Sequence, residues 1–209
     1  MRQGACILAL AAAAFAAPLA PASDVPDLSL SLLVMASPEA TLLVRPDGNG
    51  PAFTQARGPG GVVIDATLTL TLVDGFGNPI VNWPREDTWL EAADGGLVSC
   101  LGVFSGLLPD RDTDRQGQTV WVDPPLGGGW STAGAVCYVH DEAMPLAPLD
   151  LTFVSPDLNG DGRVDLSDAG PFAADLQGSY AVRSDLNADG VINISDAGIM
   201  SSAIGISCP

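Results

Sequence analysis

Positive charge is scarce in this chain, which has no lysine, one histidine and 8 arginines against 25 acidic residues, for a net charge of −17. Nucleic-acid binding needs clustered positive charge, and adhesion to anionic lipid needs a basic stretch, so neither partner is expected. Divalent cations suit such a surface better. The acids are 21 Asp and only 4 Glu, and Asp is at home in turns and metal-binding loops whereas Glu favours helices.

Catalytic motifs are equally scarce. His140 is the only histidine, so no second His exists to complete a zinc site, and no serine lies in a nucleophile-elbow motif. The few glutamates read as solvated surface rather than as a glycosidase pair. We therefore expect a protein that is not an enzyme. The four tryptophans are expected either in the core or in a sugar-stacking platform: Trp83, Trp89, Trp121 and Trp130.

The N-terminus has the layout of a signal peptide. An apolar stretch from Ile7 to Ala17 follows Arg2 and precedes a run of Pro and Ala that ends at Ser23. About eleven apolar residues are too few for a membrane span, which needs roughly 20. We expect residues 1–22 to be removed, no insertion into the membrane, and a mature protein that is secreted, extracellular or associated with the cell surface.

Cysteines are few, and with Cys6 inside the signal peptide three are left. Cys100 and Cys137 both lie in strand-like segments, so they are predicted to form a disulfide in an oxidising compartment. Cys208 is then either a free thiol or a contact to another chain.

Between residues 23 and 155 the apolar residues alternate with polar ones, Gly and Pro punctuate the chain, and helical spacing is absent, which is typical of strands. About eight strands are expected, around Leu28 to Leu32, Thr41 to Val44, Leu68 to Leu72, Thr88 to Glu91, Leu97 to Cys100, Val120 to Val122, Ala135 to Val139 and Leu149 to Val154. This number of strands in roughly 130 residues predicts a mainly β fold built on one antiparallel sandwich.

Two segments of this region resemble bacterial immunoglobulin-like domains of the invasin and intimin type. Thr69 to Ile80 runs from a strand into a Gly-Asn-Pro turn, and Thr113 to Thr119 contains a Thr-Asp-x-x-Gly turn before a later strand. The resemblance implies an immunoglobulin-like β-sandwich over residues 23–155. Any secreted sandwich also uses Gly, Asn and Pro at its corners.

The C-terminal region contains a twelve-residue segment that occurs twice, 28 residues apart, at residues 157–168 and 185–196. A calcium loop needs oxygen ligands at positions 1, 3 and 5, a backbone carbonyl at 7, an oxygen or water at 9 and a carboxylate at 12. Both copies provide this set. In the first copy the candidate ligands are Asp157, Asn159, Asp161, Arg163 through its carbonyl, Asp165 and Asp168. In the second copy they are Asp185, Asn187, Asp189, Val191 through its carbonyl, Asn193 and Asp196.

The other loop positions fit the same geometry. Gly162 and Gly190 stand at position 6, where the turn is sharp. Val164 and Ile192 at position 8 are expected to pair the loops back to back. We therefore predict two Ca²⁺ ions, and tighter binding in the first loop because it has four acids against three.

Each loop closes with Asp rather than the Glu of ordinary EF-hands, and no amphipathic helix precedes it. This EF-hand-like combination resembles the type I dockerin repeat and predicts a dockerin-like duplicated module over residues 156–209. The resemblance implies paired calcium-organised helices and attachment to a cohesin or other protein partner, with contacts at loop positions 10 and 11. These positions hold Leu166, Ser167, Ile194 and Ser195, and the basic residues common on that face are absent.

Within each predicted helix an apolar pair is expected to pack against its counterpart, namely Phe172 with Leu176 and Met200 with Ile204. Two functions follow. Either the calcium module attaches the protein to a surface or scaffold partner and displays the sandwich, or the sandwich binds carbohydrate in a polysaccharide-degrading assembly. A third possibility is that the module docks on its own chain.

Overall fold

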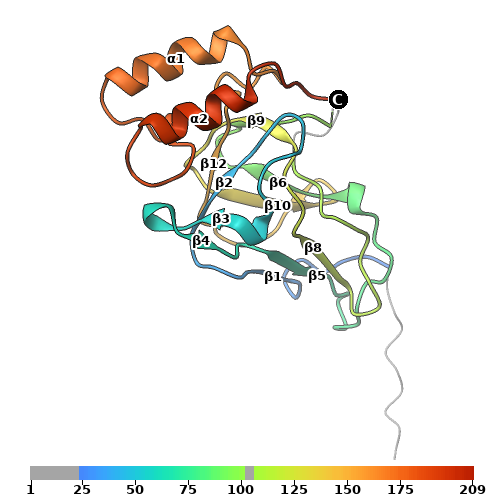
Figure 1. Cartoon of the computed structure of the whole chain (residues 1–209). Helices are drawn as coiled ribbons and strands as arrows, with labels where there is room; N and C mark the ends of the chain where they lie inside the picture. The colour runs from blue at the N-terminus through green and yellow to red at the C-terminus, as the bar shows by residue number, and fades with distance from the viewer. Residues whose placement is uncertain (1–23, 102–105) are drawn as a thin grey trace, which may run out of the picture.

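The computed structural model describes residues 24–101 and 106–209, so the predicted signal peptide, with Cys6, lies outside the described residues. The described part is mainly β, with several antiparallel sheets, and its two α-helices lie together at one end of the molecule (Figure 1). No helix in these two ranges is long and apolar enough to cross a bilayer.

The strands are short and are distributed over most of the chain. They are β1 (Leu32–Met35), β2 (Ala40–Leu43), β3 (Ala56–Arg57), β4 (Val63–Ile64), β5 (Leu68–Thr71), β6 (Thr88–Ala92), β7 (Leu97–Ser99), β8 (Gln118–Trp121), β9 (Gly127–Gly129), β10 (Ala135–Val139), β11 (Glu142–Ala143) and β12 (Leu151–Val154). The helices are α1 (Leu166–Gln177) and α2 (Ile194–Ala203), with 3-10 turns η1 (Phe53–Gln55), η2 (Pro59–Gly61), η3 (Arg85–Asp87) and η4 (Val182–Ser184).

Four sheets form from these strands. Their orders are β1-β5-β8, β11-β10-β6, β12-β2-β3-β4 and β7-β9. All pairs are antiparallel except β12 with β2, which run parallel. The parallel pair joins two segments that are far apart in the sequence, so the last strand of the β-rich region is fixed beside one of the first.

The predicted alternation is clearest in β5. Leu68, Leu70 and Leu72 are fully buried, while Thr69 and Thr71 are half exposed. Because successive side chains of a strand point to opposite faces, this pattern places one face of the sheet in the core. The segments predicted around β2, β6, β7, β8, β10 and β12 are also confirmed as strands.

The strand predicted over Leu28 to Leu32 is wrong. Residues 28–30 form a turn, because the Asp27 carboxylate accepts a hydrogen bond from the Ser29 N–H and the Asp27 carbonyl accepts from the Leu30 N–H. The strand begins at Leu32 and buries Leu33 rather than its neighbours. A local Asp cap thus prevails over an alternating apolar pattern.

Two hydrophobic cores lie on opposite sides of the β2–β12 pair. Leu42 and Phe153, which are register partners, belong to the core of the β-rich region. Val154 belongs to the core beneath the helices, and its register partner Leu43 packs against that core. Since neighbouring residues of a strand face opposite ways, this parallel pair is a wall shared by both cores, and β12 leads directly from one into the other.

The predicted Cys100–Cys137 disulfide is wrong. Cys100 is bonded to Cys208, with their Cα atoms 5.4 Å apart. Cys137 is a buried free thiol whose side chain belongs to the main core, so its strand turns it away from Cys100. The prediction relied on both cysteines lying in strand-like segments of one region, but the C-terminal segment returns across the molecule to Cys100 at the end of β7.

Candidate metal centre

The two repeats fold as matching loops, each followed by a helix. Residues 157–168 are the first loop, which follows β12 and runs into α1. Residues 185–196 are the second loop, which follows η4 and runs into α2. In each helix a capping box forms between position 9, the N-cap, and position 12, which is N3. The two residues are Asp165 with Asp168, and Asn193 with Asp196.

In the first loop, position 1 organises the turn. The Asp157 Oδ1 atom accepts from the N–H of Gly160 at 2.9 Å and of Asp161 at 3.2 Å. Its Oδ2 atom accepts from the N–H of Gly162 at 2.9 Å. One carboxylate thus satisfies three backbone donors of the loop.

Position 12 ties the two ends of the first loop together. The Asp168 carboxylate accepts from the N–H of Asn159 at 3.2 Å and from that of Asp165 at 2.9 Å. The side chains at positions 3 and 5 are exposed and bonded to each other, since Asn159 Nδ2 donates to Asp161 Oδ2 at 3.0 Å. Asp165 is exposed and accepts from the N–H of Ser167 at 2.7 Å.

The second loop repeats this network. Asp185 accepts from the N–H of Asp189 and of Gly190, and Asp196 accepts from the N–H of Asn187 and of Asn193. The carbonyl of Val191, at position 7, accepts from Asn193 Nδ2 at 3.3 Å. Asp185 has one partner without a counterpart in the first loop, because Tyr180 Oη donates to its Oδ2 at 2.8 Å.

Four carboxylates of the loops are almost completely buried: Asp157, Asp168, Asp185 and Asp196 are 0 to 2 % exposed. Burial raises the pKa of Asp157 to about 6, and the charges of Asp168 and Asp161 act in the same direction. Burial also raises the pKa of Asp196. Desolvation and like charge are the two causes that disfavour an ionised carboxylate.

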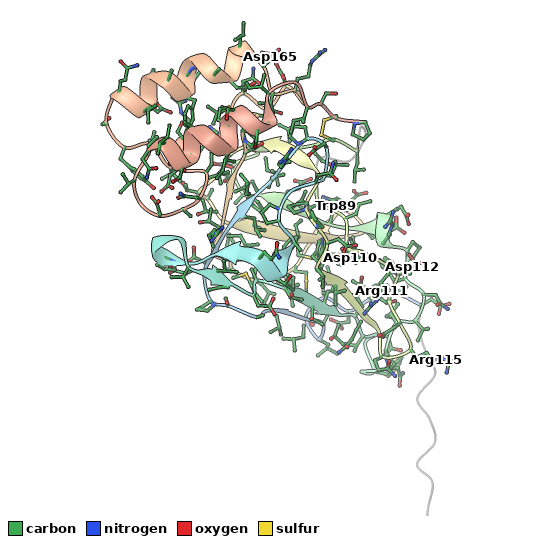
Figure 2. The ribbon with its side chains drawn as sticks, in the orientation of Figure 1. Trp89, Asp110, Arg111, Asp112, Arg115 and Asp165 are labelled. Atoms are coloured by element: carbon green, nitrogen blue, oxygen red, sulfur yellow. A yellow bond between two sulfur atoms is a disulfide. The ribbon has the colours of Figure 1, made fainter. Side chains whose placement is uncertain are left out.

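No arginine forms an ion pair with these four carboxylates in the part of the chain that the structure describes. The ion pairs there are Arg45 with Asp47, Arg85 with Glu86 and Arg183 with Asp175. Figure 2 shows Arg111 and Arg115 at the end of the molecule opposite Asp165, which lies beside α1. The four buried carboxylates therefore have no ion-pair partner among the described residues.

The predicted ligands fall into two sets. Positions 1 and 12 converge and are buried, whereas the side chains at positions 3, 5 and 9 lie toward solvent and hydrogen-bond within the loop. Across residues 24–101 and 106–209, no group of three or more His, Cys, Asp or Glu side chains is arranged to hold a metal ion.

The prediction that the two loops pair with each other through position 8 is wrong. The Val164 N–H donates to the carbonyl of Ile206, and the Val164 carbonyl accepts from the N–H of Gly205. The first loop therefore pairs with the C-terminal tail, which occupies the backbone groups of Val164 that pairing with the second loop would need. Ile192 of the second loop packs against the core beneath the helices.

The predicted apolar pairs of the helices are only half right. Phe172 and Met200 are buried in the core beneath the helices, but Leu176 is 40 % exposed and Ile204 is 48 % exposed. Ile204 comes after the last residue of α2, so it has left the helical repeat on which the spacing relied.

Sequence reasoning missed three features around the loops: the contact of the first loop with β9, the role of Cys208 beside it, and the Tyr180 hydrogen bond. One signal was present. Gly127, Gly128 and Gly129 form an unbroken glycine run, and the first loop has Gly160 where the second has Ala188. Such glycines indicate a close approach of backbone segments.

The tryptophans are divided between the core and its edges. Trp121 is 1 % exposed and donates from Nε1 to the carbonyl of Leu107, while Trp130 is 37 % exposed. Trp89 stacks on Tyr138 with ring centroids 5.6 Å apart. Trp121 is therefore unavailable to a sugar-stacking platform.

Comparison with known proteins gives no match to this chain, whether among protein-family models, curated proteins or solved structures.

Proposed function

We propose that this chain is a secreted, non-catalytic protein that binds two calcium ions, one in each loop. The observation that carries this proposal is the burial of two carboxylates per loop without a cationic partner among the described residues. An isolated buried charge is costly in free energy unless it is paired or coordinates a metal. A divalent cation provides the missing charge for both carboxylates of a loop at once.

The chemistry of the donors favours calcium over softer metals. Calcium takes six to eight oxygen ligands, and softer metals prefer nitrogen or sulfur. The loops contain only oxygen donors, from Asp, Asn and backbone carbonyl groups. The first ion would be held by Asp157, Asn159, Asp161, Arg163, Asp165 and Asp168, and the second by Asp185, Asn187, Asp189, Val191, Asn193 and Asp196.

Calorimetric titration of the full chain with calcium tests this proposal. We expect two ions per chain, with the first loop filling at lower calcium concentration. Asp157→Asn with Asp168→Asn should remove one ion, and Asp185→Asn with Asp196→Asn should remove the other. Asp65→Asn is the matched control, because Asp65 is an exposed acid outside both loops that caps the N–H of Thr67. No heat of binding in the unmodified chain would refute the proposal.

We further propose that residues 23–155 form an immunoglobulin-like β-sandwich and that residues 156–209 form a dockerin-like module. The first is supported by β5 and β6, which belong to different sheets and both contribute buried leucines, such as Leu70 and Leu90, to one core. The second is supported by the order of its elements, in which each loop runs directly into an α-helix and no α-helix leads directly into either loop.

Attachment to a protein partner is the proposed role of the module. Leu166 and Ile194, at position 10 of the two loops, are 85 % and 83 % exposed. Large apolar side chains at equivalent positions of both repeats are suited to an interface. They are the positions through which a cohesin or similar partner would be contacted.

A calcium-dependent pull-down from cell-surface extract, with the full chain as bait, tests this role. Leu166→Asp with Ile194→Asp should abolish capture, as should a chelator. Leu176→Asp should leave capture intact, because this residue of α1 is also exposed but lies outside position 10. Capture that survives both the chelator and the double variant would contradict the role.

A second role, internal docking of the module on its own chain, is favoured by the Cys100–Cys208 disulfide and by the hydrogen bond from the Gly129 N–H to the Asp157 carbonyl. Both join the C-terminal module to the β-rich region. Under this role no partner is captured.

A further inference from the structure

The two loops are similar in sequence, but the rest of the chain surrounds them differently. The first loop lies against the antiparallel pair of strands β7 and β9. The Gly129 N–H donates to the Asp157 carbonyl at 2.7 Å. A Cβ atom at Gly128 would stand 1.9 Å from Asp157 Oδ2 and 2.6 Å from its Cγ. The carboxylate at position 1 therefore occupies space that only glycine at residue 128 leaves open.

The loop backbone also lies close to β7. A Cβ atom at Gly160 would stand 3.1 Å from Val98 Cγ2 of β7. The second loop has Ala188 at the same position, with a φ of 55° in the same left-handed region as the 70° of Gly160. The loops thus share this backbone conformation, but glycine stands in the loop that lies against β7.

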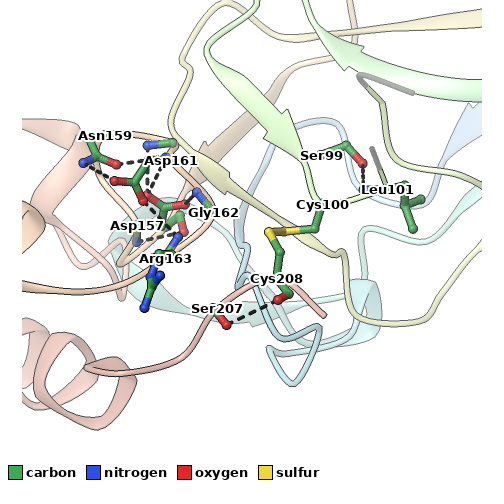
Figure 3. Close-up of a disulfide and its surroundings, with 12 residues drawn as sticks. Ser99, Cys100, Leu101, Asp157, Asn159, Asp161, Gly162, Arg163, Ser207 and Cys208 are labelled. Atoms are coloured by element: carbon green, nitrogen blue, oxygen red, sulfur yellow. Dashed lines mark hydrogen bonds between the residues drawn. A yellow bond between two sulfur atoms is a disulfide. The ribbon is translucent and has the colours of Figure 1, made fainter. Parts of the chain in front are cut away.

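The C-terminal tail contacts a further part of the first loop. The Cys208 N–H donates to the Gly162 carbonyl at 2.8 Å, and a Cβ atom at Gly162 would stand 2.8 Å from Cys208 Sγ. Cys208 is bonded to Cys100, which directly follows β7. Figure 3 shows the disulfide beside Asp157, Asp161 and Gly162. The strand pair, the disulfide and the tail together partly enclose the loop, whose side chains at positions 3, 5 and 9 stay exposed.

The second loop lacks this enclosure. A Cβ atom at Gly190 would meet nothing within 4 Å, and Asp185 lines an open cleft of about 350 Å³ together with Tyr180 and Arg57. It contacts the β-rich region at Gly61, where a Cβ atom would stand 3.1 Å from Asp189 Cβ.

We infer that the first loop is a composite calcium site, in which the β7–β9 strand pair and the disulfide-linked tail hold the Asp157 carboxylate in place for the ion. Gly128 is a positioning residue that acts through Asp157. This inference rests on the proposed calcium binding, and it adds that β7, β9 and the disulfide-linked tail set the affinity of the first loop but not of the second. Groups that orient metal ligands commonly change affinity by roughly tenfold to a hundredfold.

The test uses full-length chains in which one loop has been silenced. Asp185→Asn with Asp196→Asn leaves the first loop as the binding site. Gly128→Ala added to this chain should weaken calcium binding roughly tenfold or more in calorimetric titration. Gly75→Ala is the matched control and should change nothing, because a Cβ atom there meets only Asp27 Oδ2 at 3.7 Å. In the reciprocal chain, with Asp157→Asn and Asp168→Asn, Gly128→Ala should leave binding to the second loop unchanged.

The outcomes separate the two proposals. If the chain with a silenced second loop takes up no calcium, calcium binding by the first loop fails. If it takes up calcium and Gly128→Ala does not weaken the binding, the composite site fails. If Gly128→Ala lowers the affinity of both loops equally, its effect is on folding, and the double variant Cys100→Ser with Cys208→Ser decides. Calcium binding weakened only in the first loop supports the inference. Calcium binding weakened equally in both loops overturns it.

Discussion

Removal of the Cys100–Cys208 disulfide is the perturbation whose magnitude the structure defines best. The bond joins residues that are 108 positions apart. In the chain-entropy treatment a crosslink of this span stabilises the folded state by about 4.7 kcal/mol at 25 °C, because it restricts the unfolded chain. Cys100→Ser with Cys208→Ser should therefore lower the free energy of unfolding by several kcal/mol, and by at most about 4.7 kcal/mol.

Cys137→Ala provides the contrast. This thiol is 3 % exposed and belongs to the main core, so its truncation should cost only about 1 to 2 kcal/mol for a small cavity. Guanidinium unfolding followed by tryptophan fluorescence measures both changes, in chelator and in saturating calcium. Peptide mapping without reduction identifies the bonded pair directly. A Cys100–Cys137 peptide, or a larger loss of stability in Cys137→Ala than in the double variant, would refute the disulfide assignment.

Three further predictions concern the calcium module and its surroundings. Chelation should reduce hydrogen-exchange protection in α1 and α2 while β5 stays protected. Restoring each ion to a hundredfold excess over its dissociation constant should raise the free energy of unfolding by about 2.7 kcal/mol. Equal exchange with and without calcium would contradict this prediction. Arg183→Gln should lower the free energy of unfolding by about 1 kcal/mol at neutral pH, since hydrogen bonds from Arg183 keep the pKa of Asp175 below its ordinary value. A carboxyl group whose pKa is lowered by folding stabilises the folded state at pH values above its unfolded pKa of about 4. In urea titrations the difference in free energy of unfolding between the unmodified chain and Arg183→Gln should therefore vanish as the pH falls through the lowered pKa. The Cys137 thiol, with a pKa raised to about 12 by burial, should resist iodoacetamide in the folded protein and react on unfolding, and rapid native alkylation would be the contrary result.

The loops could be predicted from sequence because their geometry is local. Position 1 bonds to backbone groups three to five residues away, and positions 9 and 12 form a capping box within four residues. Such contacts need no other part of the chain. The strand of Leu68, Leu70 and Leu72 could be predicted for a similar reason, because alternation of residue types alone places one face in the core.

Predictions that depended on distant partners were less successful. The strand predicted over Leu28 to Leu32 failed because the turn at Asp27 ends the alternating pattern before β1 begins. The predicted partner of Cys100 and the predicted partner of Val164 were wrong for a common reason. The C-terminal tail returns to β7 and to the first loop, and no sequence pattern within these segments indicates that they meet.

The sequence by itself determined the oxygen-rich repeats, their turn glycines and the mainly β character, since each arises from residues close together in the chain. Only the tertiary structure decided which cysteine meets Cys100 and which of two similar loops is enclosed. These outcomes depend on long-range packing. The glycine run of β9 and the parallel β2–β12 pair bring the module against the β-rich region, and the surroundings of Asp157 and Asp185 diverge as a result.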